Sequence, residues 1–321
     1  MRLPMQATPL SVPDYDRLVL KLGEASVKKH FDAYADVDWD HPDHRIEHDD
    51  PRFELDDDEP LGGTEWYRSL PQASRARIGL HMVASRMHTG IDFEGILSRG
   101  LLEFASMRPC GSPELRYAYH EVIEEGQHSL MFQELVHRAG MKTDGLNAFE
   151  RWASRAVPRL GRTFPEYFFV HVLAGEAPVD QLQRRILDRK RAVHPLLRRI
   201  MQIHVTEEAR HICFAEQFLD RHVPCLGAIK TARLAIGVPF VVHGTVLTMM
   251  RTPRDVVRAH AIPRAVVREA ERSARHAAQV EEGVAPIRAR MARLGVLDAR
   301  TAPLWRWLGL LPPSQTPLLL A

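Results

Sequence analysis

Three side chains in one short stretch of the chain could bind a metal ion. His204, Glu208 and His211 stand at positions i, i+4 and i+7, so on a helix all three leave the same face. A second stretch repeats the acid and the imidazole, because Glu125 and His128 are three residues apart, as Glu208 and His211 are. Two helices that each carry Glu-x-x-His are typical of bundles that hold a pair of metal ions. The spacing therefore predicts a dinuclear metal site.

The residues around both pairs are apolar, which predicts that the charged groups lie inside the protein. Ile200 and Phe218 continue the helical face of His204, and Phe132 continues that of His128. An unpaired carboxylate or imidazole in a core costs on the order of several kcal/mol. Bound cations would remove this cost.

Two further carboxylates lie within apolar helical stripes. Glu94 is one, and the competing Glu103 lies off that face. Glu176 is the only acid in its own stripe. Pro178 follows it closely and would either kink the helix or mark its end. If the helix ends there, Glu166 is the alternative carboxylate.

Seven residues thus form the predicted set of metal ligands. They are Glu94, Glu125, His128, Glu176, His204, Glu208 and His211. The four carboxylates carry a charge of about −4, which two divalent ions would balance. Oxygen and imidazole ligands without a thiolate suit iron or manganese better than zinc or copper.

Three more glutamates lie close to these ligands in the sequence. Glu124 and Glu207 each precede a ligand histidine by four residues. Each either holds the imidazole of a facing helix in one tautomer or is exposed at the surface. Glu121 lies one turn before Glu125 and is expected either just outside the ligand shell or at the surface.

The elements that must position these groups are helices. Apolar residues recur with helical period over 13–31, 72–107 and 195–221, whereas long alternating segments and glycine-rich phosphate loops are lacking. We predict an all-α fold with a four-helix bundle core, extra flanking helices and an irregular acidic N-terminal arm. The chain is expected to form one domain, divided into an N-terminal helix and arm (1–71), a metal-binding bundle (72–250) and basic C-terminal helices with a tail (251–321).

Composition narrows the class of protein further. The chain is 45% hydrophobic and 26% charged, with a net charge of +2, which does not indicate nucleic-acid binding. Three cysteines without Cys-x-x-Cys fit a reducing cytoplasm. The apolar run from Leu234 to Met250 contains Pro239 and is short for a membrane span, so we expect a core helix and no membrane. The N-terminus does not resemble a signal peptide.

These motifs together resemble a known enzyme family. The pattern that carries the resemblance is Glu94…Glu125-x-x-His128…Glu176…His204-x-x-x-Glu208-x-x-His211. It is similar to that of the non-haem di-iron N-oxygenases typified by p-aminobenzoate N-oxygenase, over most of the chain. The third histidine is the sharpest mark, since desaturases and ferritin-like oxidases that share the doubled motif generally lack it.

The resemblance implies a ferritin-like bundle that binds two iron ions and uses O2. Such enzymes oxidise an amine nitrogen stepwise towards hydroxylamine, nitroso or nitro products, with electrons from a reductase or ferredoxin. A homodimer is also compatible with it. By resemblance, one iron would be held by Glu94, Glu125 and His128 and the other by Glu176, His204 and His211, with Glu125 and Glu208 bridging.

The substrate is where the chain departs from the family pattern. The position of a family arginine that holds the substrate carboxylate aligns with Glu282, and Asp180 replaces an asparagine. Both acids are therefore predicted at the substrate pocket, where they would suit a cationic or neutral amine better than a benzoate.

Three classes of function follow from the sequence. The first is an O2-dependent di-iron oxygenase acting on a small-molecule amine. The second is a di-iron hydroxylase or acyl desaturase acting on carbon, and analysis of products for N–O bonds separates it from the first. The third is a non-catalytic, ferritin-like metal-binding protein.

Overall fold

The chain folds into helices joined by turns and one long irregular arm. The computed structural model describes residues 11–188 and 192–312, and these two ranges contain no β-strand. The predicted all-α fold is confirmed.

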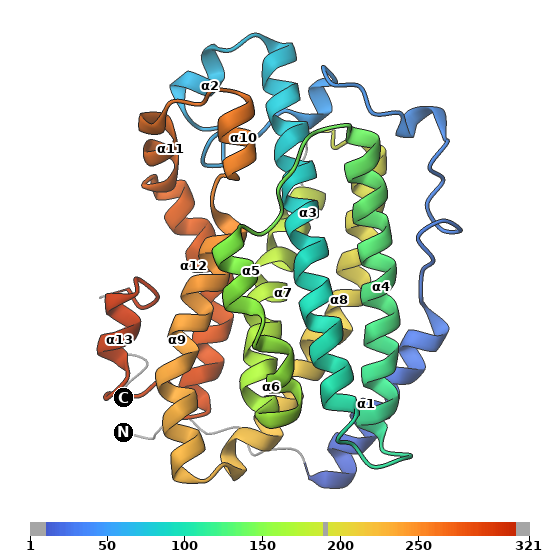
Figure 1. The fold of residues 1–321 in the computed structure, drawn as a ribbon, viewed down its shortest axis with the longest axis vertical. Helices are drawn as coiled ribbons and strands as arrows, with labels where there is room; N and C mark the ends of the chain where they lie inside the picture. The colour runs from blue at the N-terminus through green and yellow to red at the C-terminus, as the bar shows by residue number, and fades with distance from the viewer. Residues whose placement is uncertain (1–10, 189–191, 313–321) are drawn as a thin grey trace.

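Four long helices form the centre of the molecule. They are α3 (Gln72–Ala105), α4 (Pro113–Ala139), α7 (Pro165–Leu187) and α8 (Pro195–His222). Helix α3 packs along α4, and α7 packs along α8. Figure 1 shows these helices running along the long axis of the molecule. This is the bundle that the four ligand-bearing segments of the sequence require.

The ends of the helices follow from local sequence signals. Proline occupies the first turn of α4, α7 and α8, where its missing N–H has no helical partner to lose. The hydroxyl of Ser112 caps α4 by accepting the N–H of Leu115 (3.2 Å). Gly140 ends α4 with a φ of 60°, the left-handed conformation that glycine adopts without strain. Pro178 lies inside α7 rather than at its end.

The acidic arm runs along the outside of the bundle. Helix α1 (Val12–Lys28) precedes the arm and packs on α4, and the arm then runs beside α4 (Figure 1). Hydrogen bonds fasten the arm to the bundle: the N–H of Ala33 donates to Gln127 Oε1 (2.8 Å), and Arg138 donates to the carbonyl of Trp39 (2.7 Å). The arm contains the short helices η1 (Pro42–His44), η2 (Pro51–Phe53) and α2 (Glu65–Ser69).

The remaining helices cover the other side of the bundle. Helix α9 (Ala228–Met250) and α12 (Ala274–Arg293) pack against α7. The shorter ones are α5 (Ala148–Ser154), α6 (Val157–Thr163), η3 (Val223–Cys225), α10 (Arg254–Ala259), α11 (Arg264–Glu271) and α13 (Ala302–Trp307). Within the described ranges, the Ala228–Ala259 segment alone is long and apolar enough to cross a membrane, a property that core helices of soluble proteins share.

An aromatic cluster fills one end of the bundle. Phe104 of α3 contacts Phe169 of α7 edge-on, with ring centroids 5.1 Å apart, and contacts Phe218 of α8 in the same way at 5.3 Å. All three side chains are fully buried. This packing fixes three of the four central helices relative to one another, and so fixes the side chains that they direct inward.

Candidate metal centre

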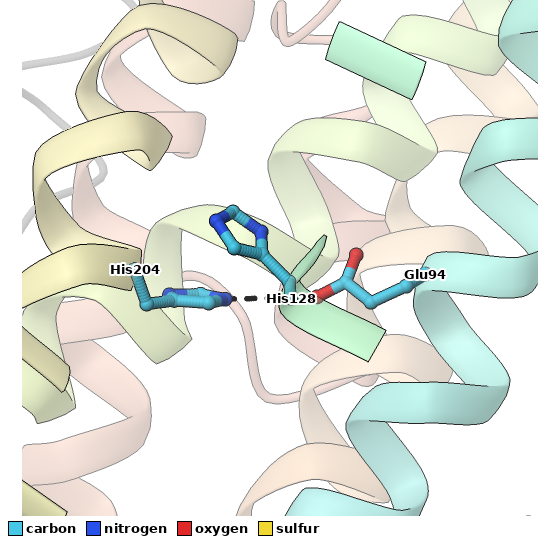
Figure 2. Close-up of side chains that lie close together, drawn as sticks. All are labelled: Glu94, His128 and His204. Carbon is cyan, nitrogen blue, oxygen red and sulfur yellow. Dashed lines mark ion pairs between the residues drawn. The ribbon is translucent and has the colours of Figure 1, made fainter. Parts of the chain in front are cut away.

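The four central helices direct the seven predicted ligand side chains into one buried cluster. Each of them is at most 2% exposed. Glu94 comes from α3, Glu125 and His128 from α4, Glu176 from α7, and His204, Glu208 and His211 from α8. Figure 2 shows Glu94 and His204 pointing toward each other across the cluster, with His128 beside them. The structure thus brings together the residues that the sequence singled out.

The Nδ1 atoms of two histidines face the carboxylates at the centre. His128 Nδ1 lies 3.2 Å from Glu125 and 3.4 Å from Glu208, and His211 Nδ1 lies 3.1 Å from Glu125 and 3.2 Å from Glu208. Donor atoms that each lie about 2.0–2.2 Å from a shared metal ion are separated by distances of this kind. Glu125 and Glu208 would therefore be within reach of ions held by either histidine.

His204 approaches the cluster from a different direction. Its Nε2 lies 3.6 Å from Glu94 and 3.7 Å from Glu208, and its ring centroid is 4.6 Å from that of His128. Its donor atom groups within 4.8 Å with those of Glu94 and His128, and also with those of Glu176 and Glu208. The second of these groups fits the partition implied by the resemblance, in which His204 and Glu176 share an ion, and the first places His204 close to the ligands of the other ion as well.

Several buried oxygens in the cluster have no partner in the protein. Oε2 of Glu94, Oε1 of Glu176 and Oε2 of Glu208 accept no hydrogen bond from any described residue. Burial, together with neighbouring carboxylates, raises the pKa of Glu94 and of Glu176 well above the ordinary range. Uncompensated acids of this kind fit a site for cations, which would supply the missing interactions.

The outer nitrogens of the same two histidines are held by acids from the facing helix. Nε2–H of His128 on α4 donates to Glu207 on α8 (3.0 Å), and Nε2–H of His211 on α8 donates to Glu124 on α4 (2.7 Å). Each bond places the proton on Nε2 and leaves Nδ1 free for a metal. Burial tends to lower the pKa of His128, but the neighbouring carboxylates of Glu125 and Glu207 outweigh it and raise that pKa to about 9.

An arginine that the sequence did not single out joins these two acids. Nη2 of Arg210 lies 2.7 Å from Glu124 and 3.5 Å from Glu207, and the residue is 8% exposed. Burial raises the pKa of Glu124, but the contacts with His211 and Arg210 outweigh it and leave that pKa below its usual value. Arg210 follows Glu207 by three residues, a helical spacing that could have indicated the pair.

Glu121 of α4 is fully buried, not exposed. Its carboxylate lies beside Glu125 and His211, and the donor atoms of the three residues lie within 4.8 Å of one another. Burial is the main cause of the strongly raised pKa of Glu121.

A cavity of about 470 Å³ opens onto one side of the cluster. Glu94, Glu176 and His204 of the cluster are among its lining residues. The apolar lining comes mainly from Met87, Phe93, Phe132, Val179, Ile186 and Met201. Five arginines also line it, namely Arg86, Arg151, Arg251, Arg254 and Arg258. Asp144 and Asp255 line it as well, so the cavity combines an apolar body and a polar part that carries both charges.

Asp180 and Glu282 do not line this cavity. Asp180 is paired with Arg184 (2.7 Å), whose guanidinium also donates to the carbonyl of Val205 on α8. Glu282 lies on α12 and pairs with Arg185, and its side chain is about half exposed. Glu176 and Val179 of α7 line the cavity, whereas Asp180 on the same helix does not, so its role at a substrate pocket stays a prediction. Glu166 is buried but belongs to none of the metal-ligand groups found in the described ranges.

Comparison with known proteins agrees with this geometry. The family model described as P-aminobenzoate N-oxygenase AurF matches residues 12–295. The chain belongs to this family. Proteins of Mycobacterium tuberculosis H37Rv and Mycobacterium bovis, named "Uncharacterized protein Rv0885" and "Uncharacterized protein Mb0909", are each 37% identical over 256 residues, covering 80% of this chain and 75% of the relative. No solved structure matches. The N-oxygenase family is a family of di-iron enzymes, and its model spans all four helices of the cluster.

Proposed function

We propose that this chain is an O2-dependent, non-haem di-iron oxygenase that oxidises an amine nitrogen of a small metabolite. The observation that supports this most is the cluster of seven buried acids and imidazoles with one side open to a cavity. Membership of the N-oxygenase family supports the same reaction class. The seven ligands are Glu94, Glu125, His128, Glu176, His204, Glu208 and His211, and manganese is the alternative metal.

The protein's part in this reaction is to hold the metal ions, to orient the substrate and to exclude water. Bound iron would supply the redox chemistry with O2. Glu124 and Glu207 fix the two imidazoles whose Nδ1 atoms face the centre. Phe93 and Phe132 form apolar walls next to Glu94, so an amine placed there is shielded from water.

The reaction requires an external source of electrons. Forming a hydroxylamine from an amine consumes one O2, two electrons and two protons and releases one water. A reductase or ferredoxin is the proposed electron donor, and the cytoplasm is the proposed location. No nucleic-acid or membrane partner is part of the proposal, and a homodimer is compatible with it.

The cavity also favours a kind of substrate. Arg251 is paired with Glu150 (2.6 Å) and Arg258 with Asp144, whereas Arg254 is exposed. Arg254 would accept an anionic or strongly polar group at this end of the cavity, while the amine lies against the apolar walls near Glu94 and His204. An amine with an anionic or strongly polar group at its other end therefore fits the cavity, whereas the sequence alone favoured a cationic or neutral amine.

The test begins with purified protein loaded anaerobically with ferrous iron. The proposal predicts two irons per chain, a transient optical signal after O2 is added, and N–O bonds in the products of a panel of aromatic and aliphatic amines. Removing iron with a chelator should abolish both the signal and the products. Hydroxylated or desaturated carbon products would instead favour the second class of enzyme. Iron binding with neither signal nor product would favour a metal-binding protein.

A further inference from the structure

The two ligand-bearing helices share a longer pattern than Glu-x-x-His. In α8 a further residue, His204, lies one turn before Glu208, so that the full pattern is His204-x-x-x-Glu208-x-x-His211. In α4 the equivalent pattern is Glu121-x-x-x-Glu125-x-x-His128. Glu121 therefore holds the position on α4 that His204 holds on α8.

The structure repeats this equivalence in space. His204 on α8 reaches the histidine of the facing helix, with its ring 4.6 Å from that of His128. Glu121 on α4 likewise reaches the other histidine, His211, and groups with it and with Glu125 within 4.8 Å. The two residues lie next to opposite members of the histidine pair.

Glu121 also shares the unsatisfied state of the ligand carboxylates. It is 0% exposed, and neither of its oxygens accepts a hydrogen bond from any described residue. Its neighbour Tyr117, one turn earlier, also has a hydroxyl without a partner, so the two do not satisfy each other. A buried carboxylate in this state is costly unless it is protonated or a cation lies beside it.

Two buried acids of the same helix that lie outside the predicted ligand set are satisfied. Glu114 accepts hydrogen bonds from Tyr15 (2.8 Å) and Arg108 (3.0 Å). Glu124 accepts them from His211 and Arg210, both at 2.7 Å. Glu121 thus behaves like Glu94 and Glu176, and unlike the structural acids of α4.

We propose that Glu121 is an eighth ligand of the metal centre, binding the ion that His211 binds. This inference rests on the proposed di-metal function. With Glu121 the site would contain five carboxylates, with a total charge of about −5 when all are ionised. Two divalent ions carry +4 and two trivalent ions carry +6. Because the negative charge of Glu121 is attracted more strongly by the higher charge, Glu121 would favour the oxidised pair of ions relative to the reduced pair.

The test compares the wild type with Glu121→Leu and Glu121→Gln. Both variants remove the ligand charge, and Gln keeps the shape. Fe2+ alone is titrated anaerobically, and the 57Fe-loaded proteins are analysed by Mössbauer spectroscopy. We expect binding of one of the two Fe2+ equivalents to weaken about tenfold or more. The Mössbauer signal of one iron should change, while the Mössbauer signal of the other iron stays the same.

Thermal unfolding gives a second readout that does not depend on activity. Without metal, Glu121→Leu should raise the Tm because it removes a buried, unpartnered acid. With iron, the same variant should gain less stability than the wild type, because a ligand is missing. Glu114→Gln is the control, since it removes a satisfied buried acid of α4 and should leave the iron affinity and both Mössbauer signals unchanged.

Two results would overturn the inference. If the wild type binds two irons and both Glu121 variants bind them with unchanged affinity and unchanged spectra, then Glu121 is a buried protonated acid and not a ligand, while the proposed function stands. If the wild type itself binds no pair of metal ions, the proposed function fails and the inference fails with it.

Discussion

The two sides of the acid and imidazole cluster differ in how their polar atoms are satisfied. On one side, Glu94, Glu176 and His204 line a cavity, and the first two keep oxygens without a partner. On the other side, the Nε2 atoms of His128 and His211 are bonded to carboxylates. We call these the open side and the closed side.

This difference indicates that the two sides of the cluster have different roles. On the closed side, His128 and His211 are tied to Glu207 and Glu124, these acids contact Arg210, and the N–H of Phe31 in the arm also donates to Glu207 (3.2 Å). Such a network holds the histidines in one orientation. The open side is less tied down, so a substrate or O2 can approach the centre there without breaking protein hydrogen bonds. The closed side should therefore control metal affinity, and the open side should control which substrate reacts.

The largest expected effect comes from breaking the closed side with Glu124→Ala. Arg210 would lose its 2.7 Å partner while remaining buried, and breaking a buried ion pair costs about 3–5 kcal/mol. Because the imidazole of His211 also loses its acceptor, iron affinity should fall about 10–100-fold. Urea unfolding and anaerobic iron titration measure the two effects.

The matched control for this prediction is an exposed ion pair. Glu103→Ala removes the partner of Arg162 at the surface (3.5 Å), which should change the free energy of unfolding by less than about 1 kcal/mol. If Glu124→Ala behaves like Glu103→Ala, the closed side does not hold the histidines as described.

A smaller effect is expected on the open side from Gly175→Ala. A Cβ at Gly175 would lie 1.8 Å from Cζ of Phe93, so this ring must move from its place in the cavity lining. Overpacking should cost about 1–3 kcal/mol and lower kcat/KM for the amine that the wild type oxidises. The iron content should remain that of the wild type, which distinguishes this variant from a closed-side one.

Gly126→Ala serves as the control for Gly175→Ala. A Cβ at Gly126 of α4 meets nothing within 4 Å, so this change should slightly stabilise the helix and leave kcat/KM unchanged. Equal losses of kcat/KM in the two variants would show that the position of Phe93 does not matter.

The smallest expected effect concerns a satisfied acid away from the centre. Burial alone would raise the pKa of Glu114, but the nearby His222 imidazole (3.4 Å) and hydrogen bonds from Tyr15 and Arg108 bring it below the ordinary value of 4.5. A lowered pKa in the folded state means that the ionised group stabilises the fold above pH 4.5 and that this stabilisation is lost as the pH falls through the lower value.

Urea unfolding of the wild type and Glu114→Gln between pH 3 and pH 7 measures this contribution. The difference should be about 1 kcal/mol near neutral pH and should shrink below pH 4.5. A difference that grows as the pH falls would contradict the assignment, because that sign belongs to an acid whose pKa is raised, as it is at Glu94 and Glu176.

Much of the fold could be predicted because its signals are local. Proline at the start of α7 and α8 and helical periodicity in α3 placed these helices within a few residues of their observed bounds. The position of Glu94 on its face followed from the same periodicity. Pro178 could not be resolved from the sequence, since a proline can either interrupt a helix or end it. In the structure it lies within α7, close to Gly283 of α12, which is a long-range contact.

The parts that could not be predicted depend on contacts between distant segments. The cavity is lined by residues of α3 and α7 together with the loops near Asp144 and Arg254, which no local pattern connects. Asp180 and Glu282 do not line this cavity, and their assignment to a substrate pocket depended on alignment rather than on helical phase. Arg210 was missed because its importance comes from Glu124, 86 residues away in the chain.

The crossed histidine and glutamate pairs restrict how the bundle can open. Helices α4 and α8 each supply one histidine and the acid that grips the histidine of the other helix. Sliding either helix along its axis by one turn would break both of these hydrogen bonds at once. Helices α3 and α7 each contribute one carboxylate to the cluster, and these carboxylates take no part in the crossed histidine and glutamate pairs. We therefore expect that small movements that admit a substrate involve α3 and α7.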